Sequence, residues 1–198
     1  MTSSRMLRKG LLACVALTLA GGASAHGGHD ASGFMAGLMH PLSGADHLLA
    51  MLSVGLWAAV ALPAGRRGLA PLLFVGLMAL GALQARLGWL QPVGLELLIA
   101  ASVLLLGALL VGGPRIAARW GLPLIGAAAA LHGAAHGLEM DPAASALAYG
   151  GGFLLATALL HGTGLALGAR WLRHSQLLRR AVGAAVGLGG ASMLLVRI

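Results

Sequence analysis

The stretch FMAGLMHPLSGADHLLAMLSVGLWAAVAL, residues 34–62, is a long apolar run that contains two histidines, an aspartate and a proline. About 20 apolar residues in a helix cross the hydrocarbon core of a bilayer, so this run is long enough to span it. An ionisable group inside hydrocarbon costs on the order of several kcal/mol, so each one here needs a function or a partner. The stretch therefore predicts a membrane-spanning segment built around a polar site.

A proline and a glycine interrupt this run. Proline lacks a backbone donor and disfavours helix at the residue before it, so we predict that the first helix is broken near Pro41. A second helix would then start between Pro41 and Ser43. Irregular backbone at membrane depth is tolerated beside a cavity, and transporters build ion sites there. The break would direct three side chains toward one cavity: His40, Asp46 and His47.

Five more apolar runs of similar length follow the first one. The composition, 59% hydrophobic and only 9% charged residues, is typical of membrane proteins and not of soluble domains. We predict an all-α, polytopic membrane helix bundle of about six transmembrane helices in one domain, residues 26–198. The five further helices are expected near residues 69–87, 93–111, 121–139, 144–168 and 181–196.

Residues 1–25 have the pattern of a signal peptide, with a basic start, a short apolar stretch and the small-residue sequence Ala23-Ser24-Ala25. We predict that this segment is cleaved and that the mature chain starts outside the membrane. Its first residues would include His26 and His29, which are either a small metal-capturing tail or a polar terminus suited to processing. The single cysteine, Cys14, lies in this segment, so a thiolate site in the remaining chain is excluded.

Arginines fall mainly in every second connection between the apolar runs, as the positive-inside rule requires. We predict a multi-pass protein of the bacterial inner (cytoplasmic) membrane with a periplasmic mature N-terminus. The net charge of +8 then orients the helices, and nucleic-acid binding is not expected. The tryptophans are expected at the membrane interfaces: Trp57, Trp89, Trp120 and Trp171. The three cytoplasmic connections contain Arg66, Arg67, Arg115, Arg119, Arg170, Arg173, Arg179 and Arg180, whereas Arg86 and Arg197 fall outside.

A second polar stretch, HGAAHGLE, occupies residues 132–139 in the fourth run. Its two histidines and its glutamate share one helical face, and Gly133 and Gly137 allow another backbone to approach. The spacing differs from the HExxH pattern of zinc proteases. Imidazole with carboxylate suits nickel, zinc, copper or iron and leaves the choice among them open. The candidate metal ligands are His40, Asp46, His47, His132, His136 and Glu139.

Five further residues are secondary candidates for metal binding. His161 can instead form an interhelical hydrogen bond, Glu96 can reach toward the interface, and Met51 can be a packing residue. The secondary set comprises His161, Glu96, His26, His29 and Met51.

Together, HPLSGADH at residues 40–47 and HGAAHGLE at residues 132–139 resemble the HupE/UreJ family of nickel permeases. The two patterns are H-x5-D-H and H-G-x-A-H-G-x-E, and the likeness extends over the mature chain to His161-Gly162-Thr163-Gly164. One departure is Leu131, where family members often carry Phe. The resemblance implies Ni²⁺ uptake, with Co²⁺ or another divalent metal as alternatives, for hydrogenase or urease maturation. It also implies that the polar residues of the two motifs are essential.

We therefore expect a transporter and not an enzyme, with no prosthetic group. Its expected partners are the transported ion and the lipid bilayer, and the sequence does not name a downstream nickel chaperone or nickel enzyme. No phosphate-binding loop is present, so the chain is not expected to use ATP directly. The alternatives are a membrane-embedded zinc-dependent hydrolase that uses these histidines with Ser43, and a metal-sensing or accessory protein for a larger transporter.

Overall fold

The computed structural model describes residues 33–140 and 145–198, and these residues form α-helices joined by short turns, without strands. This confirms the all-α prediction. The predicted signal peptide, His26 and His29 lie outside the described residues. α7 continues into a π-helical turn, Gly168–Leu172, and 3-10 turns occupy Ala64–Arg66 and Gly113–Arg115. The helices are α2 (Phe34–Ser43), α3 (Ala45–Ala61), α4 (Leu69–Arg86), α5 (Leu95–Gly112), α6 (Ala118–Glu139), α7 (Ala146–Leu167) and α8 (Gln176–Arg197).

Four helices of the described chain, α4, α5, α7 and α8, are each long and apolar enough to cross a membrane. α2 and α3 together make a fifth candidate span, bent by 84° at their junction. α6 has 22 residues, the same length as α7 and α8. It carries the HGAAHGLE stretch and is not among the candidate spans. The sixth span therefore stays a prediction.

The first span is broken at Gly44 and not near Pro41 as the sequence suggested. Pro41 lies inside α2, whereas Gly44 has extended backbone angles (φ −93°, ψ 119°) and separates α2 from α3. A proline this close to the end of a short helix removes only one backbone hydrogen bond, so α2 tolerates it. A Cβ on residue 44 would lie 3.0 Å from both Asp46 Oδ1 and His47 Nδ1. The break thus falls at a glycine, which has no side chain to crowd Asp46 and His47.

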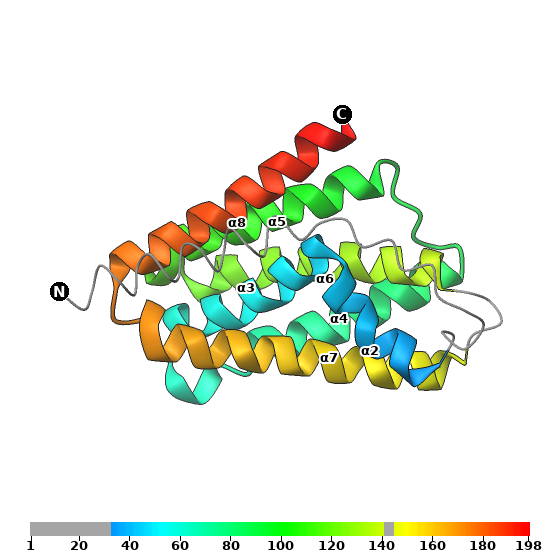
Figure 1. Ribbon diagram of the computed structural model, residues 1–198, viewed down its shortest axis with the longest axis horizontal. Coiled ribbons are helices and arrows are strands. Elements are labelled where there is room, and N and C mark those ends of the chain that lie inside the picture. The colour runs from blue at the N-terminus through cyan, green and yellow to red at the C-terminus, as the bar shows by residue number, and fades with distance from the viewer. Residues whose placement is uncertain (1–32, 141–144) are drawn as a thin grey trace.

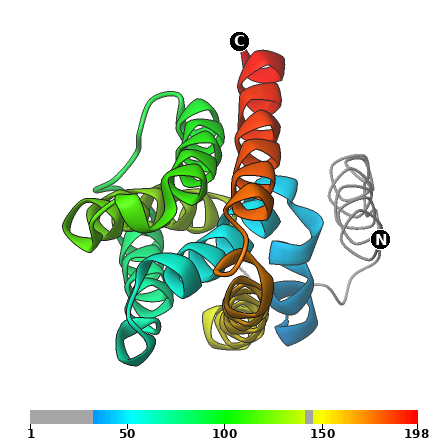
Figure 2. The same ribbon diagram turned by 90° about the vertical axis from the view of Figure 1, so that its left-hand side faces the viewer.

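α3 is the central helix of the bundle and contacts α2 and all of α4 to α8. The main pairs around it are α4 with α6, α5 with α8, and α7 with both α2 and α3 (Figure 1). The end-on view shows α5 and α8 side by side, with α3 between them and α7 (Figure 2). Trp57 of α3 is fully buried in this core, while Trp89, Trp120 and Trp171 are exposed, and the interfacial positions of the four tryptophans stay predictions.

Glycines set the close approach of the paired helices. Cβ atoms on Gly133 and Gly137 of α6 would overlap the backbone carbonyls of Met78 and Ala82 on α4, so the predicted role of these two glycines is confirmed. Gly107 of α5 faces the backbone of α8 in the same way. In a bilayer, helices associate by such close packing because no hydrophobic driving force brings them together. These contacts therefore hold the bundle together.

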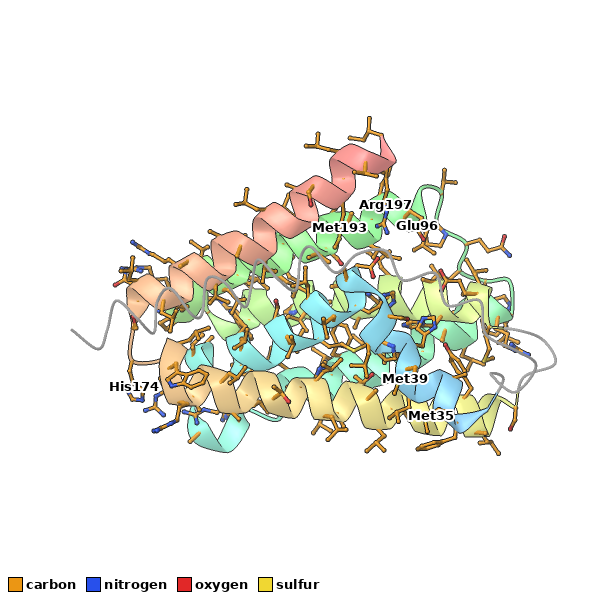
Figure 3. The ribbon with its side chains drawn as sticks, in the orientation of Figure 1. Met35, Met39, Glu96, His174, Met193 and Arg197 are labelled. Carbon is orange, nitrogen blue, oxygen red and sulfur yellow. The ribbon has the colours of Figure 1, made fainter. Side chains whose placement is uncertain are left out.

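The two ends of the bundle differ in charge. The turns after α3, α5 and α7 contain Arg66, Arg67, Arg115, Arg170 and Arg173 and lie at one end of the bundle (Figure 1). Arg179, near the start of α8, is close to Arg115 at this end. The opposite end contains the start of α3, the start of α5 and the end of α6, with one carboxylate on each. Exposed His174 marks the arginine-rich end, and Glu96 marks the acidic end (Figure 3). The three connections that the sequence places on one side of the membrane thus lie at one end of the bundle. Which side of the membrane that end faces stays a prediction.

Replacing Gly107 tests the packing, and Gly76 offers a matched control. We expect Gly107→Ala to lower the free energy of unfolding by about 1–3 kcal/mol, because its methyl group would overlap α8 backbone that cannot rotate away. Gly76→Ala in α4 points into open space and should leave stability unchanged or raise it by up to about 1 kcal/mol. Thermal unfolding of both variants in detergent measures the difference, and equal midpoints would contradict it.

Candidate metal centre

Three imidazoles from three helices meet at the acidic end of the bundle. His40 lies near the end of α2, His47 in the first turn of α3 and His136 in the last turn of α6. One ring nitrogen from each lies within 4.8 Å of the other two. Two nitrogens on one tetrahedral metal ion are about 3.4 Å apart, so shifts of about an ångström would bring all three onto one ion. The bend between α2 and α3 is what brings His40 and His47 together, with ring centroids 5.7 Å apart.

Asp46 orients His47. Its Oδ1 accepts a hydrogen bond from the backbone N–H of His47 at 2.8 Å and lies 2.7 Å from His47 Nδ1. An ionised carboxylate can only accept, so Nδ1 carries a proton, and in the neutral form of the ring Nε2 then has the lone pair. Nε2 is buried and has no hydrogen-bond partner among the described residues. A carboxylate behind an imidazole is the arrangement that prepares histidines for metal binding.

A serine on α5 orients His132 in a similar way. Ser102 Oγ donates to the carbonyl of Ile99 at 2.7 Å and lies 3.0 Å from His132 Nε2. The hydroxyl has one proton, so it accepts from His132 Nε2–H and leaves Nδ1 with a lone pair. The His132 ring is fully buried, 4.9 Å from the ring of His47. Ser102 was not predicted, and its only signal was a hydroxyl residue within an apolar run.

His136 and Glu139 complete the contribution of α6. Both ring nitrogens of His136 are buried without a hydrogen-bond partner in the described chain, and its ring packs on Phe153 with centroids 4.3 Å apart. Glu139 is half exposed at the end of the helix, with Oε2 3.9 Å from His40 Nε2. That distance is too long for a hydrogen bond. Because its side chain is half exposed, Glu139 lies at the outer edge of the cluster, which we call its mouth.

The structure brings all six primary candidates into one cluster, although their roles as ligands stay predictions. Buried polar atoms normally have hydrogen-bond partners, and leaving one without a partner is costly. In this cluster, nitrogens of His47, His132 and His136 have none among residues 33–140 and 145–198. Lone pairs that converge in an apolar interior suit a bound cation.

One of the secondary candidates lies away from this cluster. His161 of α7 is separated from it by the Phe74 ring, whose centroid is 5.2 Å from that of His161 and 6.1 Å from that of His132. Met51 is fully buried in the hydrophobic core. Among the described residues, nothing brings His161 to the three imidazoles, whereas Met51 lies one helical turn after His47 on α3.

Glu96 is connected to the cluster through an arginine that sequence reasoning treated only as an outward-facing charge. Arg197 Nη2 lies 3.2 Å from Asp46 Oδ2 and 3.0 Å from Glu96 Oε2. Arg197 lies in the last turn of α8 and Glu96 in the first turn of α5, next to each other (Figure 3). Both oxygens of Asp46 thus have partners within the protein.

Comparisons with known proteins point to one family. The family model described as "HupE / UreJ protein" matches residues 13–193. Protein HupE of Rhizobium leguminosarum bv. viciae is 39% identical over 180 residues, which cover 90% of this chain and 93% of the relative. No solved structure shows a significant match. The extent of both similarities shows that the chain belongs to the HupE/UreJ family.

Proposed function

We propose that the protein transports a divalent transition metal ion across the membrane and that Ni²⁺ is its main substrate. The observation that carries this proposal is the convergence of three imidazoles, from α2, α3 and α6, inside a bundle of membrane-length helices. Imidazole suits nickel and its neighbours in the first transition row, but it does not select among them. The choice of nickel, with cobalt second, rests on the family to which the chain belongs.

In the proposed mechanism, hydrated Ni²⁺ first approaches the acidic end, where Glu96 and Glu139 are more than half exposed. The ion then exchanges some of its waters for the ring nitrogens of His40, His47 and His136. A transport site must bind strongly enough to select its ion and weakly enough to release it. Neutral imidazoles with retained water meet both needs, because no carboxylate of the cluster must bind the ion directly.

We further propose that the acidic end faces the periplasm of a bacterial inner membrane and that the ion moves toward the arginine-rich end. The gathering of arginines at one end supports this orientation, because such residues are retained on the cytoplasmic side. Uptake in this direction would supply nickel for hydrogenase or urease maturation. The proposal requires no bound prosthetic group.

A zinc-dependent hydrolase is the alternative from another class. It would need a nucleophile or an activated water beside the metal, and Ser43 was the candidate nucleophile. Ser43 Oγ instead donates to the carbonyl of His40 at 2.8 Å, within the last turn of α2. This contact weighs against a catalytic role for Ser43 and favours transport.

Uptake of ⁶³Ni²⁺ into proteoliposomes tests the transport proposal. We expect His47→Ala and His136→Ala to reduce uptake to the level of protein-free liposomes, because each removes one of the three converging nitrogens. His174→Ala is the matched control, since this histidine is exposed at the opposite end and should leave uptake unchanged. Competition by Co²⁺, Zn²⁺ and Fe²⁺ in the same assay ranks the substrates. A wild-type protein that retains zinc and moves no nickel under any gradient would contradict transport and favour the hydrolase.

Two substitutions of Asp46 separate orientation of His47 from direct ligation. We expect Asp46→Ala to weaken Ni²⁺ binding by about 10- to 100-fold, as loss of a group that orients a metal-binding histidine does. Asp46→Asn should weaken it less, because the amide oxygen can still accept from His47 Nδ1–H. Equilibrium Ni²⁺ binding to the purified protein measures both. Equal losses in the two variants would instead indicate that the carboxylate itself binds the ion.

A further inference from the structure

Arg197 joins two carboxylates from two other helices, and we name this contact the Asp46–Arg197–Glu96 bridge. Nη2 lies 3.2 Å from Asp46 Oδ2 and 3.0 Å from Glu96 Oε2, and Nη1 donates to the backbone carbonyl of Glu96 at 2.9 Å. Three helices, α3, α5 and α8, therefore meet through one guanidinium. Figure 3 shows two of the three residues, Arg197 and Glu96, next to each other. The protein thus holds a cation of its own beside the proposed metal site.

The two halves of the bridge differ in their surroundings. The side chain of Asp46 is only 13% exposed, whereas that of Glu96 is 57% exposed. Electrostatic attraction is stronger where water is excluded, so the contact with Asp46 is the one that affects the metal site more. Asp46 in turn contacts His47 directly. Only the Asp46 carboxylate therefore lies between the positive charge of Arg197 and the candidate ligand His47. This charge disfavours the binding of a second cation at His47.

The bridge is not needed to attach α8 to the bundle. Gly183 and Gly190 of α8 pack directly on the backbone of α5. The guanidinium also has two contacts with α5 that do not involve Asp46, namely the carboxylate and the carbonyl of Glu96. If its contact with Asp46 were lost, Arg197 would remain held by α5. The contact between Arg197 and Asp46 can thus break while the contacts between Arg197 and Glu96 remain.

We propose that Arg197 is an internal competitor of the transported cation, and this inference rests on the proposed transport function. With the site empty, Arg197 neutralises Asp46. When the divalent ion binds His47, the guanidinium shifts entirely onto Glu96 and leaves the full charge of Asp46 to balance the ion. Its return to Asp46 then promotes release. Arg197 acts through Asp46, so it is a positioning residue that sets affinity and turnover and not a ligand.

Two single substitutions on either side of the bridge should have opposite effects. Arg197→Gln removes the competitor, so we expect the KM for ⁶³Ni²⁺ uptake and the Kd for Ni²⁺ to fall by about three- to tenfold, and the maximal rate to fall because release slows. Glu96→Gln removes the alternative partner and leaves Arg197 on Asp46, so KM and Kd should rise by a similar factor. Arg197→Lys should lie near the wild type, because it restores the charge.

Arg86→Gln is the matched control. Arg86 is an exposed arginine in the last turn of α4, at the same end of the bundle, and it forms no ion pair with the residues that the structure describes. Like Arg197→Gln, this substitution removes one positive charge from the acidic end of the bundle. Its effect on KM and Kd therefore measures the general electrostatic influence of that charge on cation binding. We expect KM and Kd to stay within about twofold of the wild type, since exposed charges are screened.

The outcomes separate the bridge from the transport proposal. If the bridge only fastened α8, Arg197→Gln and Glu96→Gln would shift KM and Kd in the same direction and lower thermal stability together, and the inference would be overturned. If the wild type bound Ni²⁺ without moving it, the transport proposal would fail, while opposite shifts in Kd would still support the bridge. A wild type that neither binds nor moves Ni²⁺ would overturn both.

Discussion

A polar group inside an apolar helix bundle must find a partner there, and this requirement organises the acidic end of the protein. Asp46 meets it by contacting His47 on one side and Arg197 on the other. His132 meets it with Ser102. The contacts of His47 and His132 each use one ring nitrogen and leave the other without a hydrogen-bond partner among the described residues. The same contacts therefore neutralise the buried charge and orient the histidines for the proposed cation.

The frame that makes these contacts possible is the close packing of helices through glycine. Gly133 and Gly137 follow the two histidines of α6 and contact the backbone of α4, so that face of α6 is held close to its neighbour while its histidines point toward α3. Side chains at these two positions would push α6 away from α4. Gly44 has the complementary role, because it lets the chain bend by 84° and returns His40 to His47. Small residues thus determine where the large polar ones meet.

The balance between binding and release follows from which groups approach the proposed ion. Three imidazoles offer moderate affinity, while the carboxylate of Asp46 lies behind His47 and is already paired with Arg197. Glu96 and Glu139 lie further out, where water reduces their attraction for a cation. A site whose carboxylates all bound the ion directly would hold it more tightly and release it more slowly. The arrangement suits passage of an ion better than its storage.

The sequence by itself determined the helical membrane fold, the existence of a break in the first span and the residues of the main cluster. These follow from local rules: the length of apolar runs, the cost of isolated charges in hydrocarbon, and the three- and four-residue spacing of a helical face. Tertiary structure decided that the break falls at Gly44, that Phe74 separates His161 from the cluster, and that Ser102 and Arg197 join it. Those partners lie on helices remote in sequence, and their side chains meet only because the glycine contacts bring the helices into one particular arrangement.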